Sequence, residues 1–195
     1  MDWLPLLLAL ASPLILAVLI ARYGVESLHW DEWGCEAPML KAYLSGSLDW
    51  TALSAQCNES RPVFPKLIWL ALTLVSGAAD PRWEMFMGWL IVALTAWNVF
   101  ALARRTLSLR DALWMSAGVN ALLFSPSQHE NWLWGAQMML FLPALFLTSW
   151  LRVAWSAWPE RTRALAGAAL AVRIAASGEK CTVFYSRAYL AGGLF

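Results

Sequence analysis

Long windows without a charged residue constrain this fold more than any other feature of the sequence. Uncharged windows of 19, 19, 18 and 21 residues follow Asp2, Glu84, Asp111 and Glu130. A helix needs about 20 consecutive apolar residues to cross the hydrocarbon core of a bilayer. We therefore predict an all-α, polytopic helical membrane protein. Its expected spans lie at about 3–21, 85–103, 111–127 and 132–151.

The composition agrees with a chain that lies in lipid and at the lipid boundary. Only 14% of the 195 residues are charged, which is too few to cover the surface of a soluble domain. The 14 tryptophans favour membrane interfaces, where an apolar ring can keep its N–H in water. The net charge of +1 leaves no basic footprint for nucleic acid. The expected partner is a lipid bilayer.

One apolar stretch is too short for a span. Between Lys66 and Asp80 lie 13 uncharged residues, which give roughly 20 Å of helix against a hydrocarbon core of about 30 Å. We interpret this stretch as an interfacial helix in the first outer loop. The alternative is an ordinary span whose Lys66 reaches back to the headgroups. The expected total is about four to five transmembrane helices.

The first span contains a proline. We interpret this span as uncleaved, because no positively charged region precedes it and no A-x-A cleavage site follows it. Pro13 cannot donate a backbone N–H, so it leaves one helical carbonyl without its usual partner. Such a proline is tolerated in lipid when the freed carbonyl finds another donor.

Arginines indicate the orientation. The loops 104–111 and 152–163 together carry six Arg and two acidic residues, so the positive-inside rule places them and the N-terminus in the cytoplasm. The loop 22–84 then lies outside, within a transmembrane domain of residues 1–163. This topology places both polar clusters of the chain on the outer face. If the short apolar stretch spans instead, the clusters fall on opposite faces.

The first polar cluster is "HWDEWGCE", and it contains His29, Asp31, Glu32 and Glu36. Carboxylates between interfacial tryptophans are partly desolvated, which can raise their pKa. Asp31 and Glu32 are therefore candidates for a general base that deprotonates an acceptor hydroxyl or amine. The alternative is a solvated pair of loop charges, because adjacent acidic residues are common.

Arg61 and Lys66 stand just before the short apolar stretch. Arg binds phosphate oxygens through two parallel hydrogen bonds, and Lys supplies a point charge. At the level of the outer headgroups, these two residues could hold a phospholipid or a polyprenyl phosphate. The alternative is generic anchoring to lipid headgroups.

The second polar cluster is "QHEN", which consists of Gln128, His129, Glu130 and Asn131. Its side chains could orient a sugar, bind a divalent cation or act together with the carboxylates of the first cluster. One His and one carboxylate are too few for a dedicated metal site, so we predict no metal centre and no cofactor. The alternative is a polar helix cap, in which Ser125 or Ser127 caps a helix that starts near Gln128.

Two cysteines share the outer loop. Cys35 and Cys57 are 22 residues apart, and they could form a disulfide in an oxidising periplasm. Spacing alone gives no geometry for the pair. We favour two free thiols over a disulfide.

The order of these motifs resembles the start of the GT-C superfamily of glycosyltransferases. The resemblance rests on a first span, an outer loop opening with "WDEW" and the proline-marked stretch "RPVFPKLIWLALTLVSG". The later "ALARR" and "LLFSPSQHENW" take the places of a span ending in "ARR" and of a span ending in "SP" before a second outer loop. The chain is also similar to a bacterial group of membrane proteins with "NEHR-VFP" and "ENWLWG" blocks. The resemblance covers roughly residues 3–155.

The resemblance implies inverting transfer of a sugar from a polyprenyl-phosphate donor to an acceptor on the outer face of a bacterial inner membrane. Asp31 or Glu32 would be the catalytic base. Donor or acceptor would be contacted by substrate-binding residues from three segments, namely His29, Arg61, Lys66, Gln128, His129, Glu130 and Asn131. The alternative is a non-catalytic integral membrane subunit or a transporter fragment. The sequence names no protein partner.

The C-terminal segment differs from the rest of the chain. Residues 164–172 begin like another span, but Arg173 ends the apolar stretch after nine residues. Residues 173–195 contain no window that suits lipid. We predict an incomplete span and an irregular tail at 164–195, as a truncated or frame-shifted gene would produce. The alternative is a native short tail.

Overall fold

The computed structural model describes residues 3–57 and 61–157, and these residues form helices and no β-strand. The expected incomplete span and tail at 164–195 lie outside them. The chain divides into two compact units at Arg152, and the packing described below is that of the first unit. The all-helical fold class is confirmed for the described residues.

Within residues 3–57 and 61–157, three helical segments are long and apolar enough to cross a membrane. They are α1 (Leu4–Tyr23), α5 (Pro81–Ala103) and the segment Gly135–Trp155, which contains most of α8 (Met138–Ala157). A helix of 20 residues is about 30 Å long, which matches the hydrocarbon core. The membrane class predicted from the sequence agrees with these three helices.

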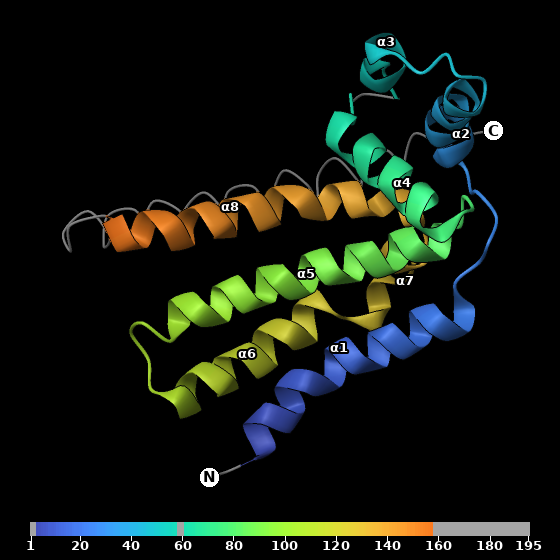
Figure 1. Cartoon of the computed structure of the whole chain (residues 1–195). Helices are drawn as coiled ribbons and strands as arrows, with labels where there is room; N and C mark the ends of the chain where they lie inside the picture. Colours follow the sequence, from blue (N-terminus) through green and yellow to red (C-terminus); the bar gives the residue numbers. More distant parts are fainter. Residues whose placement is uncertain (1–2, 58–60, 158–195) are drawn as a thin grey trace, which may run out of the picture. The chain divides into compact units, whose positions relative to one another are not determined.

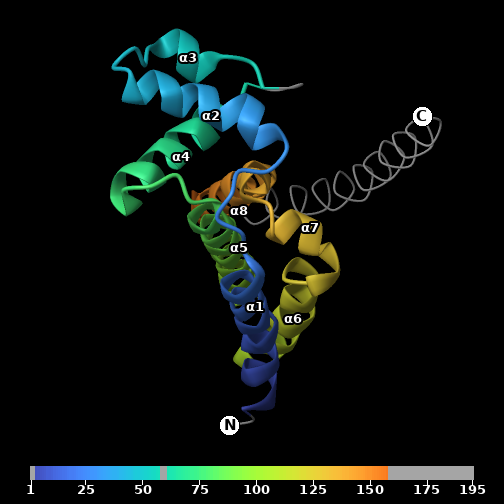
Figure 2. The ribbon, with the colours of Figure 1, turned by 90° about the vertical axis from the view of Figure 1, so that its right-hand side faces the viewer.

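The span expected at 111–127 is a shorter helix. It is α6 (Leu109–Leu123), which has 15 residues and is therefore about 22 Å long. Ser108 caps its first turn by accepting a hydrogen bond from the N–H of Asp111, and Pro126 follows soon after its last turn. Helix α6 packs along both α1 and α5 (Figure 1, Figure 2). The structure therefore does not confirm the predicted count of four to five spans.

The contacts between α1, α5 and α6 form an apolar core. Its buried side chains come from three separate stretches of the sequence, and they are Leu16, Ile20, Met85, Val92, Phe124 and Trp132. The rings of Phe124 and Trp132 stack with centroids 6.0 Å apart. Trp132 also stacks on Phe141 of α8 at 4.9 Å, so the same core continues to the third long helix.

The proline in α1 has the partner that its position requires. Because Pro13 has no N–H, the carbonyl of Ala9 loses its helical hydrogen bond. The side-chain amide of Asn120, from α6, donates to that carbonyl at 2.7 Å. The indole N–H of Trp89, from α5, donates to the carbonyl of Pro13 at 2.9 Å. Two neighbouring helices therefore satisfy the backbone around the proline.

A second polar contact ties α5 to α8. The side-chain amide of Asn98 donates to the hydroxyl of Ser149 at 2.9 Å, and its carbonyl oxygen accepts from Arg152 at 3.2 Å. Asn98 is buried between the two helices. Such interhelical hydrogen bonds fix which faces of two apolar helices meet.

The described residues between α1 and α5 form three short helices. They are α2 (Asp31–Leu44), α3 (Trp50–Ser54) and α4 (Val63–Ser76). The Ser-Gly-Ser sequence separates the first two, where Gly46 takes a left-handed φ of 70°. The carboxylate of Asp49 then caps α3 by accepting from the N–H of Ala52 at 2.8 Å.

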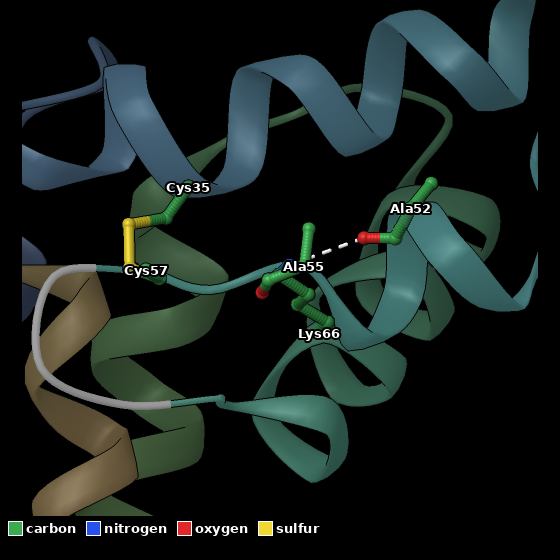
Figure 3. Close-up of a disulfide and its surroundings, with 5 residues drawn as sticks. All are labelled: Cys35, Ala52, Ala55, Cys57 and Lys66. Atoms are coloured by element: carbon green, nitrogen blue, oxygen red, sulfur yellow. Dashed lines mark hydrogen bonds between the residues drawn. A yellow bond between two sulfur atoms is a disulfide. The ribbon is translucent and has the colours of Figure 1, made fainter.

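A disulfide joins the two sides of this loop. Cys35 of α2 is bonded to Cys57, which follows α3, and both cysteines are buried (Figure 3). The preference for two free thiols was therefore wrong, because the fold of α2 and α3 brings the two Cα atoms within 5.3 Å. Closing a loop of this length stabilises a fold by roughly 3 kcal/mol in the chain-entropy model.

Helix α4 has opposite faces of different character. Its inner face buries Pro65, Lys66 and Trp69, while Phe64 and Val75 on the other side are 67% and 89% exposed. An exposed face that is apolar suits lipid better than water. The helix has 14 residues, or about 21 Å, so it is too short to cross a bilayer at right angles.

The partner of the freed carbonyl gives a first prediction. Replacing Asn120 by Ala leaves the carbonyl of Ala9 unpaired in the helix bundle, and we expect a loss of about 1 kcal/mol in the free energy of unfolding. Replacing Pro13 by Ala restores the helical donor, so Asn120→Ala should cost almost nothing in the Pro13→Ala background. Unfolding in mixed detergent and lipid micelles measures both values. Equal losses in the two backgrounds would contradict the assigned role of Asn120.

Candidate functional site

The motif "HWDEW" begins with a strained residue. Trp30 has φ 46° and ψ −113°, and it is the only non-glycine residue with a positive φ among the described residues. Such a conformation costs on the order of 1–3 kcal/mol and occurs most often at functional sites. Asp31 follows as the first residue of α2. The strain therefore lies directly before the two candidate carboxylates.

Glu32 is buried and anchored by backbone N–H groups. One carboxylate oxygen accepts from the N–H of His29 at 2.6 Å, and the other accepts from the N–H of Ala136 at 2.9 Å. Burial raises the pKa of Glu32, and the two backbone N–H groups oppose part of that shift. The bond to Ala136 joins residues that are 104 positions apart. It brings the loop between α1 and α5 against the segment that follows "QHEN".

Glu36 lies one helical turn after Glu32, so both side chains are on the same face of α2. It is completely buried, and neither of its carboxylate oxygens has a hydrogen-bond donor among the described residues. Glu84 of α5 lies beside it, within hydrogen-bonding reach. Burial raises the pKa of Glu36 to about 7, and the charge of Glu32 adds to that shift.

Gly135 packs closely against the carboxyl groups of Glu84 and Glu32. It begins the short turn η2 (Gly135–Gln137), which precedes α8. A Cβ atom at this position would lie 2.6 Å from one oxygen of Glu84 and 3.2 Å from one oxygen of Glu32. The carboxyl groups of Glu84 and Glu32 therefore meet the same piece of backbone, and Glu36 lies beside Glu84. We call Glu32, Glu36 and Glu84 the carboxyl cluster.

Aromatic rings cover the start of α2. The ring of His29 stacks on Trp30 with centroids 5.5 Å apart and meets Trp134 edge-on at 6.3 Å. Trp30 and Trp134 also meet each other at 6.0 Å. These rings come from both polar regions of the chain. His29 and Trp30 are themselves exposed, while Glu32 next to them is buried.

The positively charged side chains of Arg82 and Lys66 are bonded to groups other than the carboxyl cluster. The guanidinium of Arg82 pairs with Asp80 at 2.7 Å and with Glu26 at 2.8 Å. The ammonium of Lys66 donates to the carbonyls of Ala52 and Ala55 at the end of α3. No set of three His, Cys, Asp or Glu residues in residues 3–57 and 61–157 has an arrangement that could hold a metal ion.

The predicted site residues have different positions. His29 and Glu32 lie together at the start of α2, and the side chain of Asp31 is outside the described part of the structure. Arg61 is exposed before α4. Burial lowers the pKa of Lys66, which acts as a cap for α3 through two hydrogen bonds (Figure 3). A lysine in this position supports the loop fold.

The residues of "QHEN" lie in two short turns. They are η1 (Pro126–Gln128), which Ser125 caps through the N–H of Ser127, and α7 (His129–Trp132). Gln128, His129 and Glu130 are exposed, while Asn131 is half-buried. The capping alternative therefore holds in part, because Ser125 caps η1 while α7, which starts at His129, has no side-chain cap. The exposed side chains stay available to a ligand. Their assignment to substrate remains a prediction.

Sequence reasoning missed the partnership of Glu36 and Glu84. The spacing of four residues between Glu32 and Glu36 is a usable signal once a helix is assumed, because it places both carboxyls on one face. Glu84 lies in the first turn of α5, and in the sequence it marks only the border of an uncharged window. Nothing local in the sequence indicates that α2 folds back onto that turn.

Comparisons with known proteins add no relative. No protein-family model matches the chain, and no curated protein and no solved structure matches it.

The cluster is suited to proton chemistry. Carboxyl groups that are buried close together cannot all be ionised without a counter-charge. A carboxylate held by backbone N–H groups, next to a buried carboxyl such as Glu36 whose pKa is raised, is an arrangement typical of general acid–base sites. The cluster lies at the first turn of α5, where this helix meets the loop that precedes it.

Gly135 gives a second prediction, which tests the packing of the site. Gly135→Ala introduces a Cβ within 2.9 Å of the Glu84 side chain, so we expect it to destabilise the protein by about 1–3 kcal/mol. Gly118→Ala is the matched control, since a Cβ there meets nothing within 4 Å and the residue lies inside α6. The control should be neutral or stabilising by up to about 1 kcal/mol. Thermal unfolding in micelles measures both, and equal stability of the two variants would contradict the close packing.

Proposed function

We propose that this chain forms the first part of a GT-C-type membrane glycosyltransferase, which transfers a sugar from a polyprenyl phosphate to an acceptor on the outer face of a bacterial inner membrane. The supporting observation is the hydrogen bond between Glu32 and Ala136. It joins the "WDEW" loop to the segment after "QHEN", and these are the two regions that the resemblance treats as outer loops. A carboxylate-bearing site at the end of transmembrane helices suits this reaction.

The proposed reaction is a displacement with inversion. A carboxylate takes the proton of the acceptor hydroxyl, whose oxygen then attacks the anomeric carbon of the sugar. The bond from that carbon to the phosphate oxygen breaks, and polyprenyl phosphate leaves. Both oxygens of Glu32 are engaged by backbone N–H groups. We therefore assign the role of base to Asp31 and a positioning role to Glu32.

The outer location of the site follows from the disulfide in this proposal. Disulfides persist in oxidising compartments and are rare in the cytosol. The Cys35–Cys57 bond therefore favours a loop 22–84 on the outer side and a cytoplasmic N-terminus. The apolar exposed face of α4 would then lie in the outer leaflet, with exposed Arg61 near the headgroups. From there Arg61 could contact the donor phosphate.

The proposed topology gives a third prediction. Single cysteines at Ser47 and Ser127 should react with a membrane-impermeant thiol reagent added to intact cells. A cysteine at Ser108 should react only after the membrane is opened. All three positions are exposed in the structure, so access depends on the side of the membrane alone. Opposite sides for Ser47 and Ser127 would overturn the shared outer face.

The assigned base gives a fourth prediction. Release of polyprenyl phosphate reports turnover whatever the sugar and acceptor, so it can be followed in membranes supplied with a panel of polyprenyl-phosphate sugars. We expect Asp31→Asn to reduce this release by at least about 100-fold. Glu26→Gln is the matched control, because Glu26 is an exposed carboxylate of the same loop. Full release by Asp31→Asn would exclude Asp31 as the base, and no release by the unaltered protein would exclude the proposed reaction.

A second candidate function is supported by Glu84. This residue is buried in the first turn of α5, and buried acidic residues within spans often mark proton pathways. A transporter fragment or a non-catalytic subunit would therefore also suit the cluster. Proton flux across reconstituted vesicles distinguishes the two functions. Flux that Glu84→Gln abolishes would favour transport over sugar transfer.

A further inference from the structure

Glu36 and Glu84 lie so close together that both cannot be ionised without strong repulsion. The two side chains lie within hydrogen-bonding reach, and they come from different elements, α2 and α5. Glu36 is completely buried and Glu84 is 2% exposed. A carboxylate can only accept hydrogen bonds, so no bond forms between the pair until one of them carries a proton.

The surroundings supply no other partner for these oxygens. Both oxygens of Glu36 and one of Glu84 have no donor among the described residues. The side-chain amide oxygen of Gln137, in the adjacent turn η2, is also buried without a donor among the described residues. Buried polar atoms without partners are rare in native proteins and call for an occupant. For two facing carboxyl groups, the smallest occupant that satisfies both is a proton.

The charged groups around the pair strengthen this requirement. Glu32 on the same face of α2 and Asp80 before α5 both add negative potential. His29 acts on Glu32, at the far end of the cluster. Arg82 is paired with Asp80 and Glu26, and the ammonium of Lys66 is bonded to the carbonyls that end α3. In residues 3–57 and 61–157 no cation pairs with Glu36 or Glu84.

We propose that Glu36 and Glu84 form a proton-binding site, in which one shared proton fastens α2 to the outer end of α5. With the proton present, one carboxyl donates to the other and the contact is attractive. Without it, two buried negative charges repel each other across the contact between α2 and α5. The bond between Glu32 and the N–H of Ala136 belongs to the same contact, so it weakens when the proton is lost. This inference holds whichever function the chain has.

The sign of the pH dependence follows from Glu36. Burial, together with the charge of Glu32, raises the pKa of Glu36 from its ordinary 4.5 to about 7, and the hydrogen-bonding contact with Glu84 opposes part of that shift. A carboxyl whose pKa is raised by folding stabilises the closed contact fully below its ordinary value. The stabilisation that Glu36 contributes is lost as the pH rises through 4.5 to about 7, and the last proton of the pair leaves above that interval. The ratio of closed to open contact falls by at most about tenfold for each pH unit in that interval.

Infrared spectroscopy tests the shared proton directly. The carbonyl stretch of a protonated carboxylic acid is separate from the amide band and from that of a carboxylate. In the purified full chain in lipid nanodiscs, we expect an acid band at neutral pH that disappears well above pH 7. Glu36→Gln and Glu84→Gln should each remove it, and Glu26→Gln should not. No acid band in the unaltered protein, or a band unchanged in both variants, would overturn the proposal.

Hydrogen exchange tests the fastening of α2. We expect the amide of Ala136, corrected for the intrinsic rate at each pH, to lose protection as the pH rises through the same interval. In Glu36→Gln an amide replaces the protonated acid and can donate to Glu84, so protection should no longer depend on pH. Formation of the Cys35–Cys57 bond shows that each variant is folded. Protection of Ala136 that is independent of pH in the unaltered protein would contradict the proposed fastening.

Discussion

A buried polar group in lipid has no water to bond, and most of this structure can be understood from that constraint. The carbonyl of Ala9, which Pro13 leaves without a helical donor, accepts a hydrogen bond from the side-chain amide of Asn120. Asn98 of α5 makes two hydrogen bonds to α8. These bonds choose which faces of the long helices meet, because apolar faces alone would slide in lipid. The relative positions of the long helices then decide where the loop between α1 and α5 can pack.

The fold of the loop between α1 and α5 depends on different interactions, since its helices are too short to be stable alone. The Cys35–Cys57 bond and the two hydrogen bonds of Lys66 hold α2, α3 and α4 together. A buried ammonium without a carboxylate partner is costly, and the two carbonyls at the end of α3 offset part of that cost. The residue that looked like a phosphate ligand in the sequence therefore has a structural task. Exposed Arg61 keeps the charge that a headgroup or a donor phosphate could meet.

The sequence was most informative where one physical quantity decides the outcome. Uncharged length located α1, α5 and α8, and the missing N–H of Pro13 required a partner for Ala9. No sequence pattern predicted that Cys35 pairs with Cys57 or Glu36 with Glu84, because each pairing depends on how α2 folds back. The strain at Trp30 has the same origin. Distances between segments far apart in the chain are set by packing, and no local pattern records them.

The carboxyl cluster connects these observations. The strained backbone at Trp30 persists only because the surrounding contacts hold it, and the nearest of these are the two backbone bonds of Glu32. One of those bonds lies beside the Glu36 and Glu84 pair, whose contact is attractive only with a proton between them. The protonation of the pair and the conformation of the "WDEW" motif are therefore coupled through a single turn of α2. A site that moves protons gains from such coupling, since the charge that it releases or accepts also determines how firmly its base is held.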